Sequence, residues 1–511
     1  MGGFRPGGRP GHGCAGLTLV RRWLFADQLG PHFVEPGRPA LLVLSRAAFA
    51  RQRVHRAKAH LLLSAVQHRA AELGDRALLL GRATYREALA EVGEPIDVCA
   101  PTSRAADAFV RGLPGVSVLP ERGWVLSRDE FAAWAAGRRR LRLEDYYRDV
   151  RRRLGLLLDA DGQPVGGRWN YDADNREPPP RGATSLHEVG VTEPWWPVED
   201  DVDLAVRATL DRWERDHGVT FVGRDGPRRF AVTHAEASAA LAHFVEHRLA
   251  AFGRNEDAML AGDPWMAHSL LSVPLNLGLL DPVEVVRAAE QAYREGRAGL
   301  ASVEGFVRQV VGWREYVWHV YWFAGDGYRR RNALAAHTRL PRWFEQADAD
   351  AVQARCLSNV LGQVREAGWA HHIPRLMVLG SWALQRGYDP DALTDWFRRW
   401  FVDGYDWVME PNVVGMSQHA DGGLMATKPY AAGGAYVNRM SDYCGGCRYD
   451  PRVRVGPTAC PFTAGYWAFL ARTRDALAGN PRMAQPLRGL DRLHDLDSLL
   501  AQEAARGSAP P

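Results

Sequence analysis

The sequence predicts an N-terminal α/β domain with a doubly wound parallel sheet, followed by a large all-α domain. Short apolar runs alternate with a helical pattern between residues 17 and 135, which is typical of βαβ units. After residue 200, nearly every segment has apolar residues at helical spacing. A chain of 511 residues is long enough to form two or three domains with substantial cores.

In the first domain, four apolar runs have the length and bounding residues of buried strands. A helical pattern lies between two of them and ends at Gly74, a favoured helix terminator. Parallel sheets of this kind bind ligands beyond the carboxyl ends of their strands, and Asp27 and Gln28 follow the first strand. The predicted strands lie within 17–26, 40–45, 76–81 and 95–101, and the helix spans 56–74.

The remaining boundaries follow from composition. Residues 1–16 are rich in glycine, proline and arginine, which predicts a disordered extension. Residues 136–200 form an interdomain linker, because "EPPPR" cannot adopt regular structure. Residues 201–511 form the all-α domain, with helices expected at 202–216, 234–252, 283–295, 302–323, 353–367, 375–387 and 391–402.

The composition is that of a globular protein in a reducing compartment. Hydrophobic residues make up 46% of the chain and charged residues 24%, and the net charge is only +4, which excludes a polycation. No run of about 18 apolar residues occurs, so we expect no membrane span. Six cysteines in 511 residues do not form a secreted disulfide framework. We therefore expect a cytoplasmic protein.

Half of the cysteines fall in one short segment, "DYCGGCRYDPRVRVGPTACP". Cys444 and Cys447 form a C-x2-C pair, and Cys460 follows twelve residues later, with Cys356 as the best candidate for a fourth ligand. Four thiolates around one centre indicate structural zinc or an iron–sulfur cluster. The spacing alone leaves zinc and iron open, and three ordinary buried thiols are the alternative.

Three further stretches mix polar residues with apolar helices. Ser269 and Ser272 begin an apolar helix, where hydroxyls bind phosphate or simply cap the helix. His371 and His372 precede a proline, a pattern more often structural than catalytic. The aromatic-rich stretch 395–430 contains carboxylates that packing does not require, which indicates a bound polar, flat molecule.

Together these segments resemble one family. The order "HSLLS", "GWREY", "AHHIPRLMVLG", "FVDGYDWVMEPNVVGMSQHADGG" and "MSDYCGGC" is similar to that of the photolyase/cryptochrome family, and more narrowly to its bacterial iron–sulfur branch. That branch contains prokaryotic (6-4) photolyases and cryptochrome-like relatives. The resemblance covers about residues 17–475 and implies an α/β antenna-binding domain and an all-α FAD-binding catalytic domain.

The resemblance implies two redox cofactors. It assigns a [4Fe-4S] cluster to Cys356, Cys444, Cys447 and Cys460, which favours iron over zinc. FAD would lie inside the helical domain. The match to the family leaves open whether Glu410 or Asn412 occupies one of the positions at FAD. The residues that the resemblance places at FAD are Ser269, Leu270, Ser272, Trp313, Arg314, Glu315, Asp403, Asp406, Glu410 and Asn412.

The activity implied is light-driven repair of UV-damaged DNA by a monomer, with (6-4) photoproducts as the expected lesion. Excited reduced FAD would transfer an electron to the damaged pyrimidine dimer, flipped out of the duplex, and a histidine would assist proton transfer. His372, with His371 beside it, matches the family's catalytic histidine, and Tyr430 and Tyr436 match the lesion pocket. Arg181 and Arg439 are candidates for phosphate contacts. The alternatives are a cryptochrome-like blue-light photoreceptor without repair activity and a metal-stabilised binding protein without flavin.

Electron supply and light harvesting complete the predictions. Trp396 matches the inner member of the family's electron-transfer chain, but Phe397 and Asp348 replace oxidisable residues found in relatives. Trp343 and Trp400 are candidate substitutes. The resemblance implies a 6,7-dimethyl-8-ribityllumazine antenna in the α/β domain, with Asp27 and Gln28 as its candidate contacts.

Overall fold

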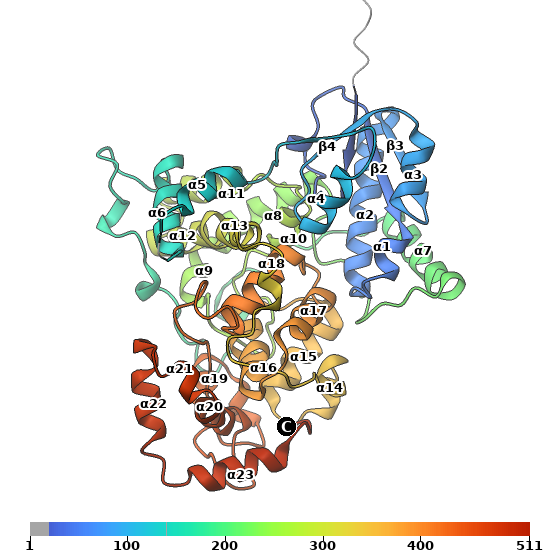
Figure 1. Ribbon diagram of the computed structural model, residues 1–511. Helices are drawn as coiled ribbons and strands as arrows, with labels where there is room; N and C mark the ends of the chain where they lie inside the picture. The colour runs from blue at the N-terminus through green and yellow to red at the C-terminus, as the bar shows by residue number, and fades with distance from the viewer. Residues whose placement is uncertain (1–19, 139) are drawn as a thin grey trace, which may run out of the picture.

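The computed structural model describes residues 20–138 and 140–511. The predicted extension, 1–16, and the beginning of the predicted first strand, 17–19, lie outside the described residues. An α/β unit forms one end of the molecule, and the helical body extends from it to the helices α20 to α23 at the other end (Figure 1). No helix in the described part of the chain is long and apolar enough to cross a membrane.

The α/β unit is built on five parallel strands in the order β3-β2-β1-β4-β5. The predicted doubly wound parallel sheet is thus confirmed, and the strand order reverses between β1 and β4. The fifth strand was not predicted, because its four residues are only partly buried. The strands are β1 Arg21–Leu24, β2 Ala40–Ser45, β3 Ala77–Arg82, β4 Ile96–Cys99 and β5 Val116–Leu119.

Helices between the strands cover the sheet, and two more lead away from it. The predicted helix at 56–74 is α2, which ends at Leu73. The next residue, Gly74, has a positive φ, a conformation that glycine adopts easily. Helices α5 and α6 leave the sheet and pack on the helical body. The helices are α1 Arg46–Ala50, α2 Arg56–Leu73, α3 Tyr85–Val92, α4 Arg104–Arg111, α5 Arg128–Ala135 and α6 Leu143–Leu154.

The first helix after the linker belongs to the α/β unit in space. Helix α7, Asp201–His217, packs on α2 through a small cluster that contains Leu63, Val206 and Leu210. A buried ion pair between His60 and Asp203 joins the same two helices. The linker in sequence therefore does not mark the limit of the packed unit.

The rest of the chain is helical, as predicted. The helices are α8 His234–His247, α9 Leu249–Asn255, α10 Ser272–Asn276, α11 Pro282–Arg294, α12 Leu300–Val307, α13 Glu315–Ala324, α14 Arg342–Glu345, α15 Arg355–Ala367, α16 Ser381–Arg386, α17 Pro390–Trp400, α18 Asp406–Glu410, α19 Gly434–Met440, α20 Pro461–Arg472, α21 Arg474–Leu477, α22 Ala484–Leu490 and α23 Leu496–Arg506.

Three of these helical segments contain a π-helical turn: η6 Arg308–Arg314, η9 Pro374–Gly380 and η10 Pro411–Ser417. Each joins an α-helical stretch directly, so the predicted continuous helices at 302–323 and 375–387 are each interrupted. A π turn widens the backbone locally and is common at functional sites. All three turns face the same interior region.

Candidate active site and cofactor cavities

The π-helical turns surround a cavity of two adjoining chambers, about 590 Å³ and 300 Å³. We call it the central cavity. Trp313 and Arg314 of η6, Leu376 of η9 and Asn412 of η10 contribute to its wall. Its volume is in the range of about 300–1,000 Å³ typical of cofactor sites. The larger chamber also reaches Tyr430 and Tyr436, so that the cavity connects two predicted sites.

A buried ion pair fixes one wall of the central cavity. Arg375 donates to both carboxylate oxygens of Asp403 at 2.9 and 3.0 Å, and the Ser272 hydroxyl donates to the same carboxylate at 2.9 Å. The Arg375 guanidinium also lies 4.2 Å from the centroid of the Phe401 ring. One carboxylate thereby joins α10, η9 and the loop after α17.

Most of the residues predicted to bind FAD meet in this cavity. Three do not line it: Glu315 accepts from the Val125 amide, Asp406 lies in the wall of a second cavity, and Glu410 pairs with Arg104 of α4. Burial raises the pKa of Glu315 to about 7. The predicted residues that do line the cavity are Ser269, Leu270, Ser272, Trp313, Arg314, Asp403 and Asn412.

The predicted catalytic residues lie on the same cavity. His371 is buried, whereas the side chain of His372 is 43% exposed and its Nε2 lies 3.5 Å from Asp257 Oδ1. Burial opposes ionisation of Asp257, but the hydrogen bond and charge of His372 outweigh it and lower the carboxyl pKa. Burial raises the pKa of Tyr430 and Tyr436 above the usual tyrosine value.

Sequence reasoning missed three of these residues: Asp257, His268 and Arg375. Asp257 follows α9 in a turn with no motif around it, and its position beside His372 depends on the packing of segments more than 100 residues apart. Arg375 was visible in "HHIPRL" but nothing indicated its partner. His268 immediately precedes the two serines already predicted, and that adjacency was an available signal.

The four predicted cysteine ligands face one another between α15, the turn at 443–446 and the start of α20. Burial and the three neighbouring thiols raise the pKa of Cys356. No three of these four sulfurs lie within 4.8 Å of one another. A single zinc ion with Zn–S bonds of about 2.3 Å would bring its sulfurs to about 3.8 Å. The wider spacing therefore suits a larger cluster.

A glycine leaves room beside these thiols. A Cβ atom on Gly434 would lie 2.9 Å from Cys460 Sγ and 2.5 Å from Thr463 Oγ1, both closer than packed atoms approach. Any other residue at position 434 would push into the space between the cysteines. The chain thus keeps the thiol-lined site open on the side of α19.

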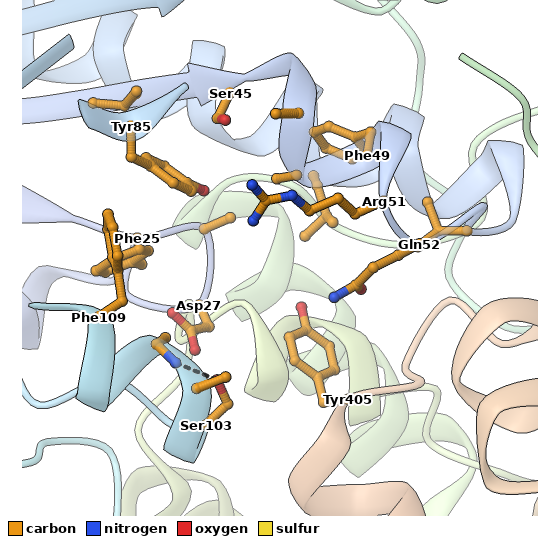
Figure 2. Close-up of a pocket in the computed structure, with 18 of the residues that line it drawn as sticks. Phe25, Asp27, Ser45, Phe49, Arg51, Gln52, Tyr85, Ser103, Phe109 and Tyr405 are labelled. Atoms are coloured by element: carbon orange, nitrogen blue, oxygen red, sulfur yellow. Dashed lines mark hydrogen bonds between the residues drawn. The ribbon is translucent and has the colours of Figure 1, made fainter. Parts of the chain in front are cut away.

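A second cavity of about 670 Å³, which we call the sheet-edge cavity, lies at the carboxyl ends of β1, β2 and β4. Figure 2 shows Asp27 and Arg51 directed into it, with aromatic rings around them. Asp27 accepts from Thr102 at 2.5 Å, and burial raises its pKa. Gln28 turns away and donates to the Cys99 carbonyl at 2.9 Å.

The helical domain supplies part of this wall. Lys58 of α2 donates to the Gly404 carbonyl at 2.5 Å and lies 4.9 Å from the centroid of the Tyr405 ring. Burial lowers the pKa of Lys58 to about 8. Trp407 lines both the sheet-edge cavity and the central cavity, so the two are separated by one short segment.

The predicted electron-transfer tryptophans form a buried group behind the central cavity. Phe397 lines the cavity, and its ring centroid lies 5.2 Å from that of Trp396. The ring centroids of Trp396 and Trp400 lie 6.0 Å apart. The Phe344 ring separates Trp396 from Trp343, with centroid distances of 4.9 and 5.7 Å. The three tryptophans are therefore neighbours, but phenylalanine lies between them and the cavity.

Comparison with known proteins shows to which family this chain belongs. A family model described as deoxyribodipyrimidine photo-lyase-related protein matches residues 22–220. A protein of Agrobacterium fabrum named (6-4) photolyase is 46% identical over 373 residues, which cover 73% of this chain and 70% of that protein. The chain belongs to the photolyase family. Membership in this family implies FAD as a cofactor.

Two further similarities are more limited. An uncharacterized protein of Acanthamoeba polyphaga mimivirus is 48% identical over 54 residues, 11% of this photolyase-family chain and 44% of that protein. The crystal structure of a bacterial class III photolyase from Agrobacterium tumefaciens superposes with a TM-score of 0.53 and 17% identity, covering 81% of each chain. At that identity the likeness concerns the fold alone, and it agrees with the two-unit architecture described above.

Replacing Asp403 should impair cofactor binding in the central cavity and leave the sheet-edge cavity intact. Asp403→Asn removes the charge that balances the partly buried Arg375, and an unpaired buried charge costs about 3–5 kcal/mol. We expect the purified variant of this photolyase-family protein to retain much less FAD than the wild type, as measured by the fluorescence of flavin released on denaturation.

Asp406→Asn is the matched control, because Asp406 lies three residues away but faces the sheet-edge cavity. It should keep the wild-type FAD content, with circular dichroism confirming that both variants are folded. Equal FAD contents in the two variants would contradict the assignment of the central cavity.

Proposed function

We propose that this protein is a light-driven DNA repair enzyme, a (6-4) photolyase with FAD as its catalytic cofactor. One observation carries the proposal: the His372–Asp257 pair and two tyrosines line the same cavity as the predicted FAD residues. The 46% identity to a protein named (6-4) photolyase supports the lesion class.

FAD in its reduced form, when bound and excited by light, supplies an electron to a nearby base and accepts it back. The residues of the central cavity suit its parts. The Ser269 hydroxyl can donate to phosphate, whereas the Ser272 hydroxyl donates to Asp403, which Arg375 also holds. Arg314 offers an Nε with no protein partner among the described residues. This unpartnered donor is consistent with a polar ligand.

His372 is the proposed proton donor to the lesion. Asp257 Oδ1 lies 3.5 Å from Nε2, so the carboxylate can accept a hydrogen bond from that nitrogen and restrict rotation of the ring. Asp257 therefore positions His372.

The DNA contacts follow from access to the cavity. The two linked bases of a lesion reach it only by leaving the stacked duplex, which costs little for a lesion that is already poorly stacked. Tyr430 and Tyr436 then line its sides. Arg439, 5.7 Å from the Tyr436 ring centroid, is a candidate for phosphate contact at the rim, as is Arg181.

The four cysteines are proposed to hold a [4Fe-4S] cluster. Support comes from the sulfur spacing, which exceeds that of a single zinc site, and from the space that Gly434 leaves. Such a cluster would tie α15 to the start of α20. Its role in this account is structural.

The sheet-edge cavity is proposed to hold the 6,7-dimethyl-8-ribityllumazine antenna. Aromatic walls and the polar groups of Asp27 and Arg51 suit a heteroaromatic ring with a polyol chain. Asp27 is the proposed contact. Gln28 orients the loop after β1, through its bond to Cys99, and does not touch the cavity. Trp396, Trp400 and Trp343 remain the proposed electron-transfer residues, with Phe397 as a barrier on the route from the cavity.

Repair is tested by illuminating the reduced protein with an oligonucleotide that contains a (6-4) photoproduct and following the lesion by chromatography. The wild type should restore the bases. His372→Ala should lower the repair rate by about 10²–10⁴-fold, the usual contribution of a positioned acid, without loss of FAD. Asp257→Asn should also lower the repair rate while FAD stays bound, because the ring loses the carboxylate that positions it.

His337→Ala, at an exposed and distant histidine, is the control and should repair normally. Lesions that stay intact after long illumination of the fully reduced wild type would point to the photoreceptor alternative. Full repair by His372→Ala would remove that residue from the mechanism.

The cluster assignment predicts about four iron and four labile sulfide ions per chain. Cys356→Ala should abolish most of this content and lower the melting temperature, since one ligand and the link to α15 are lost. Cys99→Ala, at a buried thiol on β4, should leave iron and sulfide unchanged. Stoichiometric zinc in place of iron in the wild type would refute the cluster.

A further inference from the structure

Three histidines converge on one side of the central cavity. His268 precedes α10, and His371 and His372 precede η9. Each offers a ring nitrogen, and the three nitrogens lie within 4.8 Å of one another. The His268 and His371 ring centroids are 4.3 Å apart, and His372 lies 5.6 and 5.8 Å from them. Repair chemistry as proposed above uses His372 but gives no role to the other two.

The two inner rings are buried and incompletely bonded. His268 Nε2 and His371 Nδ1 have no hydrogen-bond partner among the described residues, although His268 is only 9% exposed and His371 only 4%. Burial and the neighbouring rings lower the pKa of both. A neutral imidazole keeps an in-plane lone pair, which is the form that binds metal ions. Unpaired buried nitrogens otherwise cost free energy.

The third ring has the partner that metal-binding histidines usually have. His372 Nε2 lies 3.5 Å from Asp257 Oδ1, a buried carboxylate oxygen with no other hydrogen-bond partner among the described residues. A carboxylate that orients a histidine in this way fixes its tautomer and raises its basicity as a ligand. His268 and His372 also line the larger chamber of the cavity, which offers space for a further ligand.

We propose that His268, His371 and His372 form a site for a divalent transition-metal ion of the zinc class. Three imidazoles with one open position are a known zinc arrangement. Metal–nitrogen bonds of about 2.0–2.1 Å require nitrogens about 3.3 Å apart. Because the nitrogens already lie within 4.8 Å of one another, they close by at most about 1.5 Å on binding, which rotation of side chains facing a cavity can supply.

The site would regulate repair. A metal ion on His372 occupies the lone pair that otherwise carries the transferable proton, so bound metal blocks proton donation to the lesion. This consequence rests on the proposed function, whereas the metal site itself does not.

The test is a titration of the FAD-loaded, cluster-containing protein with Zn²⁺ by calorimetry, in the dark and without DNA. The wild type should bind one Zn²⁺ ion that His268→Ala binds at least about tenfold more weakly. Asp257→Asn, which keeps all three ligands, should weaken binding by about 10–100-fold. His243→Ala is the matched control, because half-buried His243 and exposed His247 form a second histidine pair, on α8, with ring centroids 4.9 Å apart.

Wild-type affinity in both His268→Ala and Asp257→Asn would overturn the proposal, as would loss of binding in His243→Ala alone. In the repair assay, Zn²⁺ should inhibit the wild type reversibly, with recovery on chelation. A FAD-loaded, cluster-containing protein that binds Zn²⁺ as described but repairs nothing when no Zn²⁺ is added would refute the proposed function and leave the site standing.

Discussion

The ion pair between Arg375 and Asp403 is the constraint on which the central cavity depends. Its two charges are largely removed from water, and they are held by a two-pronged contact with Ser272 as a third partner. Such a pair adds little net stability against an apolar core, yet losing one partner is costly. The pair therefore specifies geometry. It fixes the relative positions of α10, η9 and the loop before α18, three segments that form the wall of the cavity.

That same loop separates two binding spaces. Residues 403–407 pass from the carboxylate in the central cavity to Tyr405 and Asp406 in the sheet-edge cavity, and Trp407 touches both. Lys58, which belongs to the α/β unit, holds this loop by donating a hydrogen bond to the Gly404 carbonyl. An antenna in one cavity and a flavin in the other would thus be separated by a few side chains, a short path for transfer of excitation energy.

Much of the fold was predictable, because it depends on local periodicity. Four of the five strands and the helix α2 follow from apolar runs and a glycine terminator, whereas β5 is short and half exposed and leaves no such pattern. The π-helical turns were not predictable. Their residues keep helical spacing, and the widened hydrogen bonding arises from packing around the cavity.

The same distinction between local pattern and tertiary packing decides which site residues could be predicted. Residues carried by contiguous motifs, such as the "HSLLS" serines and "AHH", could be named from sequence and lie at the cavity. Residues whose role depends on a distant partner could not. Asp257 acts through His372, more than 100 residues away, and Asp406 and Glu410 share a stretch with Asp403 yet face other surroundings. Sequence order gives no information on which side of a short loop a carboxylate points.

The most direct measurement of the central claim is a crystal structure of the purified protein with a duplex that contains one (6-4) photoproduct. The account predicts FAD against Ser272 and Asp403, and the lesion extruded from the duplex with a ring nitrogen of His372 within hydrogen-bond distance. A lesion still stacked in the duplex, or a central cavity that holds no flavin, would contradict it.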